Sequence, residues 1–305
     1  MKSRASAPAK AILFGEHAVV YGKPAIAAAV DRRVTVTLGD SSENRVTIPS
    51  LGVDFRSESS PRGGILDYVG KTLKLYHDGS PLSIQIEMEI PVGSGLGSSA
   101  ALTVALIGAL DEYHGRESEP EDTAARAHRV ELEVQGAASP LDTTVSTYGG
   151  LVYLDSQRNV EKVNARLHDL VIAHLDHSGD TAEMVAGVAE LRSRFPDVMD
   201  GIMDAVEMIT MRAYRALMSN SPEPIGDLMN INQGLLDAMG VSTGELSMMV
   251  YEARSAGAAG SKITGAGGGG SIIAYCPGCA EDVAEALNRN WNAMKARFSE
   301  EGLIR

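Results

Sequence analysis

A glycine-serine loop that runs directly into an apolar helical pattern carries the clearest chemical signal in the sequence. The loop is Pro91-Val92-Gly93-Ser94-Gly95-Leu96-Gly97-Ser98-Ser99. Glycines let backbone N–H groups turn toward an anion without Cβ clashes, and a helix N-terminus adds unpaired N–H groups and a favourable dipole. The hydroxyls of Ser98 and Ser99 can reach a phosphate or a phosphate-bound Mg²⁺. Taken alone, the loop fits either a phosphate site or a glycine-rich turn that caps a helix.

The residues of the loop exclude two common nucleotide motifs. It lacks the Gly-Lys-Ser/Thr ending of a Walker A loop. The dinucleotide fingerprint requires a glycine at the position of Ser98. A nicotinamide-dependent dehydrogenase is therefore disfavoured.

A lysine and two acids elsewhere in the chain supply groups that phosphoryl transfer needs. This reaction requires a group that orients or deprotonates the attacking hydroxyl, and cations that neutralise the phosphate oxygens. Asp142, in a polar turn, suits the first role if Lys10 lies beside it, and Glu131 together with a serine hydroxyl can hold Mg²⁺. Asp142 fits equally well as the cap of a helix that starts at Thr143, and a lone lysine is usually solvated.

A second glycine-rich run lies far along the chain, between two apolar strand patterns. It reads Lys262-Ile263-Thr264-Gly265-Ala266-Gly267-Gly268-Gly269-Gly270. Such a run cannot fill a core, so it indicates a close backbone approach to a ligand or to a neighbouring segment. A flexible linker is the alternative, but linkers are rarely bracketed so tightly by apolar strands.

The two cysteines of the chain form the sequence Cys276-Pro-Gly-Cys279. A structural zinc site needs four ligands and no second pair exists, so we expect a turn that carries two thiols, with redox chemistry as the alternative. So few cysteines, without a signal-peptide pattern, predict a cytoplasmic protein. No apolar stretch approaches the ~20 residues of a membrane span.

Composition describes a globular protein that does not bind nucleic acid. Apolar residues make up 44% of the 305 residues and charged residues 22%. With 27 basic and 40 acidic residues the net charge is −13, which repels polyanions, and no basic stripe interrupts it.

The expected elements come in blocks instead of a regular strand-helix alternation. Strands are predicted at residues 11–14, 34–38, 46–48, 82–90, 151–154, 261–264 and 271–275. Helices are predicted at residues 66–76, 100–113, 122–134, 181–195, 200–219, 225–239, 244–256 and 280–298. This order predicts two α+β domains, residues 1–160 and 161–305, divided near the polar stretch 156–167.

Four segments in order, residues 7–22, 91–101, 139–150 and 262–270, resemble the motifs of the GHMP kinase superfamily. The first contains Gly15-Glu16-His17 followed by Val20-Tyr21-Gly22, and the second matches the superfamily's ATP loop almost position for position. The likeness spans nearly the whole chain and is greatest to the shorter archaeal members that phosphorylate mevalonate. It implies a two-domain α+β fold with ATP and substrate in the cleft between the domains, a role in isoprenoid precursor biosynthesis, and a homodimer.

The resemblance also implies roles for individual residues. Asp142 corresponds to the base that takes the proton of the 5-hydroxyl of mevalonate, and Lys10 lowers the pKa of that hydroxyl. Ser98 and Glu131 correspond to Mg²⁺ ligands. The implied ATP contacts are Pro91, Val92, Gly93, Ser94, Gly95, Leu96, Gly97, Ser98, Ser99, Ala100, Ala101 and Gly267. The implied substrate contacts are Glu16, His17, Tyr148, Thr181, Gly265 and Ala266.

Some positions depart from the family pattern. Ala9 replaces a common glycine, and Leu141 replaces a small or hydroxyl residue. Ala189 stands where a basic residue is frequent, with Arg192 nearly one turn further on.

Alternative functions stay open. They are a sister kinase acting on phosphomevalonate, homoserine or a sugar, a decarboxylase of the same fold, and an inactive ligand-binding relative. Phosphomevalonate would require more cationic residues than Lys10 and Lys262.

Overall fold

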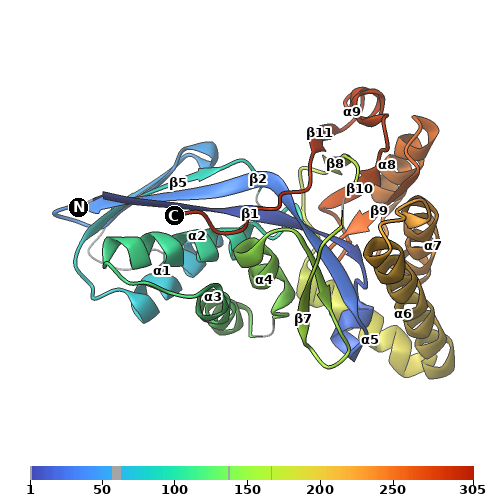
Figure 1. Ribbon diagram of the computed structural model, residues 1–305, viewed down its shortest axis with the longest axis horizontal. Helices are drawn as coiled ribbons and strands as arrows, with labels where there is room; N and C mark the ends of the chain where they lie inside the picture. The colour runs from blue at the N-terminus through green and yellow to red at the C-terminus, as the bar shows by residue number, and fades with distance from the viewer. Residues whose placement is uncertain (1, 57–62, 92, 137, 166) are drawn as a thin grey trace.

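The structure is a computed structural model that describes residues 2–56, 63–91, 93–136, 138–165 and 167–305. Val92, one of the expected ATP contacts, lies outside these residues. Two sheets, each with its own helices, lie side by side along the long axis of the molecule (Figure 1). The predicted fold class, α+β with two domains, is confirmed.

The first sheet is built on a long antiparallel pair, β1 and β2. Alternate residues of β1, among them Ala5, Ala7 and Ala9, are buried, as expected for a strand with one face on the core. The strand order is β4-β3-β5-β2-β6-β7, with β1 on the free side of β2. The strands are β1 Lys2–Phe14, β2 Ala25–Asp40, β3 Arg45–Ile48, β4 Val53–Arg56, β5 Leu82–Met88, β6 Leu151–Leu154 and β7 Val160–Val163.

Helices cover one face of this sheet, and α2 lies innermost (Figure 1). Helix α2 is buried from Ala100 through Asp111 because it packs on β1 and β2 and is itself covered by the other helices. Its small residues permit close contact; at Gly108 a Cβ would meet the Leu303 side chain at 2.7 Å. These helices are α1 Ile65–Tyr76, α2 Ser98–Tyr113, α3 Pro120–Gln135 and α4 Leu141–Tyr148, and short 3-10 turns lie at Ala18–Tyr21 and Pro49–Leu51.

The second sheet is antiparallel, in the order β11-β8-β10-β9. One set of its apolar residues packs with helices of the second half of the chain in a second core. Another set belongs to the core that includes the first sheet: Leu170, Ile172, Ile273 and Tyr275. The strands are β8 Leu170–His174, β9 Gly260–Thr264, β10 Ser271–Tyr275 and β11 Asn292–Ala296. The helices are α5 Thr181–Arg194, α6 Pro196–Met218, α7 Ile225–Ala238, α8 Gly244–Ser255 and α9 Ala280–Leu287.

The two halves are joined at more than one place. After β11 the chain returns to the first sheet, where Phe298 bridges to Val30 and Ile304 to Ser6. The boundary between the domains at residues 160/161 remains our proposal. Strand β7 starts at that point, and the chain reaches the second sheet at Leu170.

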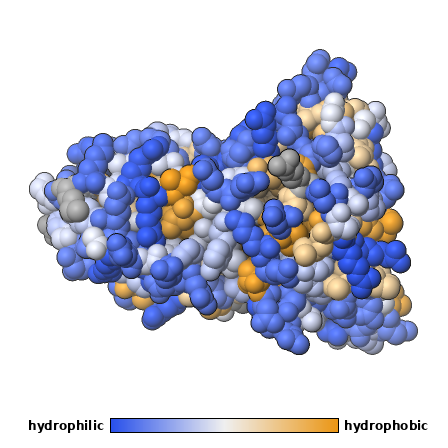
Figure 2. Space-filling model, in the orientation of Figure 1, coloured by the Kyte–Doolittle hydropathy of each residue, from blue (hydrophilic) through white to orange (hydrophobic). Residues whose placement is uncertain are grey.

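On the face shown in Figure 2, hydrophilic residues predominate and apolar residues form separate small groups. Within the described residues, no helix is long and apolar enough to cross a membrane.

The helix predicted at residues 280–298 is wrong in its second half. Helix α9 ends at Leu287, and β11 follows at Asn292. Asn288 competes with the helix, since its side chain exchanges two hydrogen bonds of 2.9 Å with the backbone of Ala293. Strand β11 then pairs with β8 and satisfies the backbone groups of that strand. The helix predicted at residues 181–195 ends before Pro196, as expected, but the next helix starts at Pro196 and not at residue 200, because the missing N–H of proline does no harm in the first turn of a helix.

Candidate active site

The centre of the site is an ion pair between the first strand and the helix α4. The Nζ atom of Lys10 lies 3.1 Å from Oδ2 of Asp142 and donates a hydrogen bond of 3.2 Å to the carbonyl oxygen of Gly95. The backbone N–H of Lys10 donates to the carbonyl oxygen of Leu96 at 2.9 Å. Lys10 is buried, whereas the Asp142 side chain is 29% exposed. The structure thus brings a cation, an accessible carboxylate and the glycine-serine loop together.

Glycines shape the loop around the lysine. Gly97 is the N-cap of α2 with φ +70°, and a Cβ there would lie 2.8 Å from Cγ of Lys10. Gly93 and Gly95 also have positive φ, and the Ser94 hydroxyl closes the turn by donating to the carbonyl oxygen of Pro91 at 2.7 Å. Because Gly97 has no side chain to cap the helix, the first N–H groups of α2 are available to an anion.

The first turn of α2 presents backbone groups and two hydroxyls. Ser98 and Ser99 are partly exposed there, whereas Leu96, Ala100 and Ala101 are buried. The last three can therefore offer a ligand only backbone contacts. The hydroxyl that hydrogen bonds the Glu131 carboxyl group belongs to Ser99, next to the Ser98 expected in this role.

Glu131 of α3 is an almost buried carboxyl group beside this turn. Burial raises the pKa of Glu131 to about 8; the charge of Asp142 acts in the same direction, and Lys10 and the Ser99 hydroxyl oppose the rise. A buried carboxyl next to a hydroxyl offers the hard oxygen ligands that Mg²⁺ prefers. No group of three or more His, Cys, Asp or Glu residues within the described part of the chain could hold a metal. A cation here would need further oxygens, such as those of a bound phosphate.

The second glycine run packs directly on the first. A Cβ at Gly95 would lie 3.1 Å from the carbonyl oxygen of Thr264, and one at Gly270 would lie 3.2 Å from that of Ser94. The hydroxyl of Thr264 accepts from the N–H of Ile12 at 2.9 Å and lies 3.2 Å from its carbonyl oxygen. The run therefore holds β9 and β10 of the second domain against the loop and β1 of the first. The glycine run was expected to lie close either to a ligand or to a neighbouring segment of the chain, and the structure shows the neighbouring segment.

Glu16 and His17 are both tied to this run. Glu16 forms an ion pair with Lys262, which is completely buried in β9, and its other oxygen accepts from Nδ2 of Asn232 at 3.3 Å. The His17 ring, on a residue with φ +59°, hydrogen bonds the carbonyl oxygen of Ala266 at 2.9 Å. Burial lowers the pKa of His17, and the Ala266 carbonyl and Glu16 oppose this. Glu16 thus fixes the strand end that carries His17. The pairing of Glu16 with Lys262 and Asn232 was not predicted from the sequence. A lysine within the apolar strand pattern of residues 261–264 could have indicated a buried acidic partner.

Two expected substrate residues lie in different surroundings. Thr181 is exposed at the start of α5, one turn before Met184, whose side chain contacts Gly268 of the second run. Tyr148 ends α4, its carbonyl oxygen accepts from Nζ of Lys162 at 3.2 Å, and its neighbour Gly149 packs on the chain end near residue 301. The structure therefore places Thr181 near the glycine run and does not bring Tyr148 to the Lys10 centre.

Gly265, Gly267 and Arg192 complete the expected set. Gly265, with φ +85°, packs against the backbone of Gly95, and Gly267 is so close to the carbonyl oxygen of Val241 that a side chain would clash. Arg192 donates to Asp200 at 2.6 Å and lies over the ring of Tyr21, 4.7 Å from its centroid. Its guanidinium is thus engaged away from Lys10.

Comparison with known proteins agrees with this geometry. The GHMP kinases N terminal domain model matches residues 66–150, and the GHMP kinases C terminal model matches residues 213–293. The chain is 75% identical to a mevalonate kinase of Methanothermobacter thermautotrophicus over 100% of both sequences, and 41% identical to one of Thermococcus onnurineus over 99% and 98%. The crystal structure of the Methanococcus jannaschii mevalonate kinase superposes with a TM-score of 0.85 at 27% identity, covering 98% of each chain. The chain therefore belongs to the GHMP kinase family and, within it, to the mevalonate kinases.

Proposed function

We propose that this protein transfers the γ-phosphoryl group of ATP to the 5-hydroxyl of (R)-mevalonate, giving 5-phosphomevalonate and ADP for isoprenoid precursor biosynthesis. The observation that carries the proposal is the position of Lys10 Nζ, 3.1 Å from Asp142 Oδ2 and 3.2 Å from the Gly95 carbonyl oxygen. The Lys10 ammonium thus contacts both the accessible Asp142 carboxylate and the glycine-serine loop, whose free backbone N–H groups can bind phosphate. Among proteins of this fold, the full-length similarity to mevalonate kinases supports mevalonate as the acceptor.

Asp142 is the proposed base. Its side chain is 29% exposed, so a hydroxyl can reach the carboxylate. As the 5-oxygen forms its bond to the γ-phosphorus, its proton passes to Asp142 and the bond to the β-phosphate oxygen breaks, releasing ADP. The ammonium of Lys10 stabilises the negative charge that develops on the attacking and phosphoryl oxygens.

The nucleotide is proposed to bind along the loop and the first turn of α2. Backbone N–H groups of residues 93–101 hold the phosphates, and Gly267 approaches from the second domain. Glu131 with the hydroxyls of Ser98 and Ser99 would hold Mg²⁺, which fits their oxygen chemistry. When bound, the ion neutralises charge on the phosphate oxygens.

The acceptor side of the site is proposed to consist of His17, Gly265 and Ala266, with Thr181 at its edge. His17 is held by the Ala266 carbonyl, so the two would move as a unit. Glu16 acts through Lys262 by fixing this strand end, since both of its oxygens have protein partners.

The cations of the site favour mevalonate over a phosphorylated acceptor. Of the two lysines in the motifs, Lys262 is completely buried and paired with Glu16. Lys10 remains to serve the transferred phosphoryl group, so a second phosphate on the acceptor would lack a partner from these motifs.

A coupled ADP-release assay with a substrate panel tests this function. We expect turnover with (R)-mevalonate and little or none with phosphomevalonate, homoserine or galactose at equal concentrations. Turnover with one of the other acceptors and none with mevalonate would refute the proposal.

Two further proposals rest on the family resemblance and on composition. We propose a homodimer, which sedimentation velocity would detect as a species of about twice the chain mass of 32.2 kDa. We also propose a cytoplasmic location, in keeping with only two cysteines in the chain.

A further inference from the structure

The Cys-Pro-Gly-Cys segment at the end of β10 forms a tight turn that the kinase reaction does not use. The N–H of Cys279 donates to the carbonyl oxygen of Cys276 at 3.5 Å, and Gly278 has φ +78°. Proline at the second position and a positive-φ glycine at the third define a type II β-turn. Such a turn holds its end Cα atoms within ~7 Å, and a disulfide spans Cα atoms ~4.4–6.8 Å apart. The backbone is therefore compatible with a bond between the two sulfurs.

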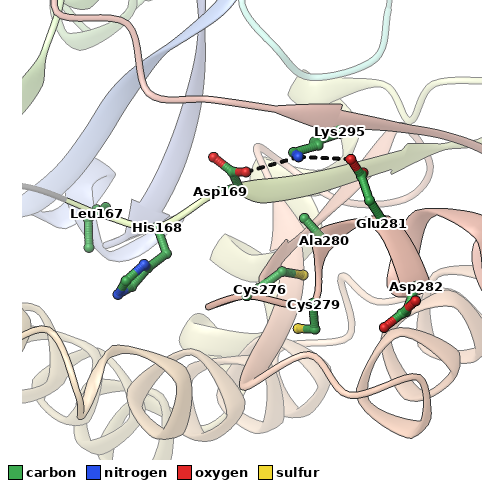
Figure 3. Close-up of a pocket in the computed structure, with 10 residues that line it drawn as sticks. Leu167, His168, Asp169, Cys276, Cys279, Ala280, Glu281, Asp282 and Lys295 are labelled. Carbon is green, nitrogen blue, oxygen red and sulfur yellow. Dashed lines mark hydrogen bonds and ion pairs between the residues drawn. The ribbon is translucent and has the colours of Figure 1, made fainter.

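Both thiols line a cavity of about 360 Å³ that is formed by the segment before β8, the turn after β10, the first residues of α9 and Lys295 of β11 (Figure 3). Cys276 is 1% exposed, whereas Cys279 is partly exposed. The Cys276 thiol donates to the carbonyl oxygen of Ala274 at 3.4 Å and the Cys279 thiol to that of Gly257 at 3.3 Å. Burial, followed by the neighbouring Cys279, raises the pKa of Cys276. Because Cys279 is the more exposed of the two, it is the thiol that a dissolved reagent meets first.

Metal binding is the other chemistry that paired thiols support, and the surroundings do not favour it. Among the residues that the structure describes, no third His, Cys, Asp or Glu joins the pair in a group able to hold a metal. A structural zinc site requires four such ligands. Redox chemistry between the two sulfurs remains.

We propose that Cys276 and Cys279 form a reversible intramolecular disulfide by exchange with small neutral or cationic disulfides. The Cys279 thiolate attacks one sulfur of the external disulfide, forms a mixed disulfide and releases one thiolate. Cys276 then loses its proton to water and attacks the sulfur of Cys279, which expels the second thiolate. The external disulfide gains two electrons and becomes two thiols, while the protein pair is oxidised.

The charge around the cavity selects the reagent. Asp169, Glu281 and Asp282 line it, and its one lysine, Lys295, is already paired with Asp169 at 3.2 Å and Glu281 at 3.1 Å (Figure 3). This excess of carboxylates repels an anionic disulfide and attracts a cationic one. Cystamine should therefore oxidise the pair faster than glutathione disulfide at equal concentration and low salt.

Intact-mass analysis of the wild-type chain tests the proposal independently of kinase activity. Reduced protein is incubated with cystamine or glutathione disulfide under native conditions, quenched in acid, unfolded and alkylated with iodoacetamide. Because the chain has only these two cysteines, the count of alkyl groups is unambiguous. We expect a monomer that has lost two hydrogen atoms, takes no alkyl group, forms faster with cystamine and reverts with dithiothreitol.

Three results would overturn the proposal: unreacted thiols in the folded protein, a lasting adduct on Cys279, or a disulfide between two chains. Equal rates with the two oxidants would overturn the charge selectivity. The Cys276→Ser variant should stop at a stable mixed disulfide on Cys279. The Cys279→Ser variant should react far more slowly, because Cys276 is buried. Circular dichroism checks the fold of both, and the wild-type mass decides alone if either fails to fold.

Discussion

Replacement of Gly97 by alanine places a methyl group where the Lys10 side chain passes. The new Cβ would lie 2.8 Å from Cγ and 3.0 Å from Cε of Lys10, whereas ordinary contacts begin at 3.4 Å. Since Lys10 is buried, its stem must shift by about half an ångström, which moves the ammonium away from Asp142. A misplacement of ~1 Å can reduce catalysis ~100-fold, so we expect kcat to fall by about 10- to 100-fold.

Gly115, just beyond the other end of α2, provides the matched control. Its φ of +63° is close to the +70° of Gly97, but within the described residues a Cβ at Gly115 would meet no heavy atom within 4 Å. Both alanine variants should therefore lose ~1–2 kcal/mol of the free energy of unfolding, from backbone strain alone. Urea denaturation measures this loss, and the ADP-release assay measures kcat. A wild-type kcat in Gly97→Ala would refute the expected displacement of Lys10, and so would an equal loss of activity in Gly115→Ala.

Two further predictions concern the buried charges of the site. Lys262→Met should lower the free energy of unfolding by ~3–5 kcal/mol in urea denaturation, because it leaves Glu16 buried without its partner. The double variant Lys262→Met with Glu16→Gln should recover part of this loss. A loss below ~1 kcal/mol in the single variant would contradict the prediction. Glu131, whose pKa is raised to about 8, holds a proton at neutral pH and must release it to bind Mg²⁺, so the affinity for Mg·ATP should rise as pH increases toward 8. Calorimetry of Mg·ATP binding in buffers of different ionisation enthalpy should detect the released proton. Glu131→Gln should abolish the release. If the release persists in Glu131→Gln, Glu131 is not the source of the proton.

The catalytic pair could be anticipated from the sequence, but its geometry could not. Lys10 and Asp142 are far apart in the chain, and their 3.1 Å contact depends on β1, the loop and α4 being packed together. The choice between Ser98 and Ser99 as the partner of Glu131 shows the same limit. Successive residues of a helix point ~100° apart, so the side chain that faces α3 depends on where α2 begins and how it packs.

The fold was predicted best where the apolar pattern is strong and local. The expected helix at residues 100–113 and strand at residues 82–90 correspond closely to α2 and β5. The alanine-rich parts of β1 and β2 were missed because alanine has little intrinsic strand preference, and pairing with the neighbouring strands decides their structure. Strand β11 was misread as helix for a related reason: its conformation depends on pairing with β8, more than a hundred residues away.

Single-turnover transfer from γ-labelled ATP to (R)-mevalonate, by the wild type and by Asp142→Asn, measures whether Asp142 is the base. We expect labelled 5-phosphomevalonate from the wild type. In the variant, transfer should slow ~10²- to 10⁴-fold while ATP still binds, because the loop and α2 are intact. Asp122→Asn, at a side chain that is 59% exposed on α3, should behave as the wild type. Transfer by Asp142→Asn at the wild-type rate would show that Asp142 is not the base.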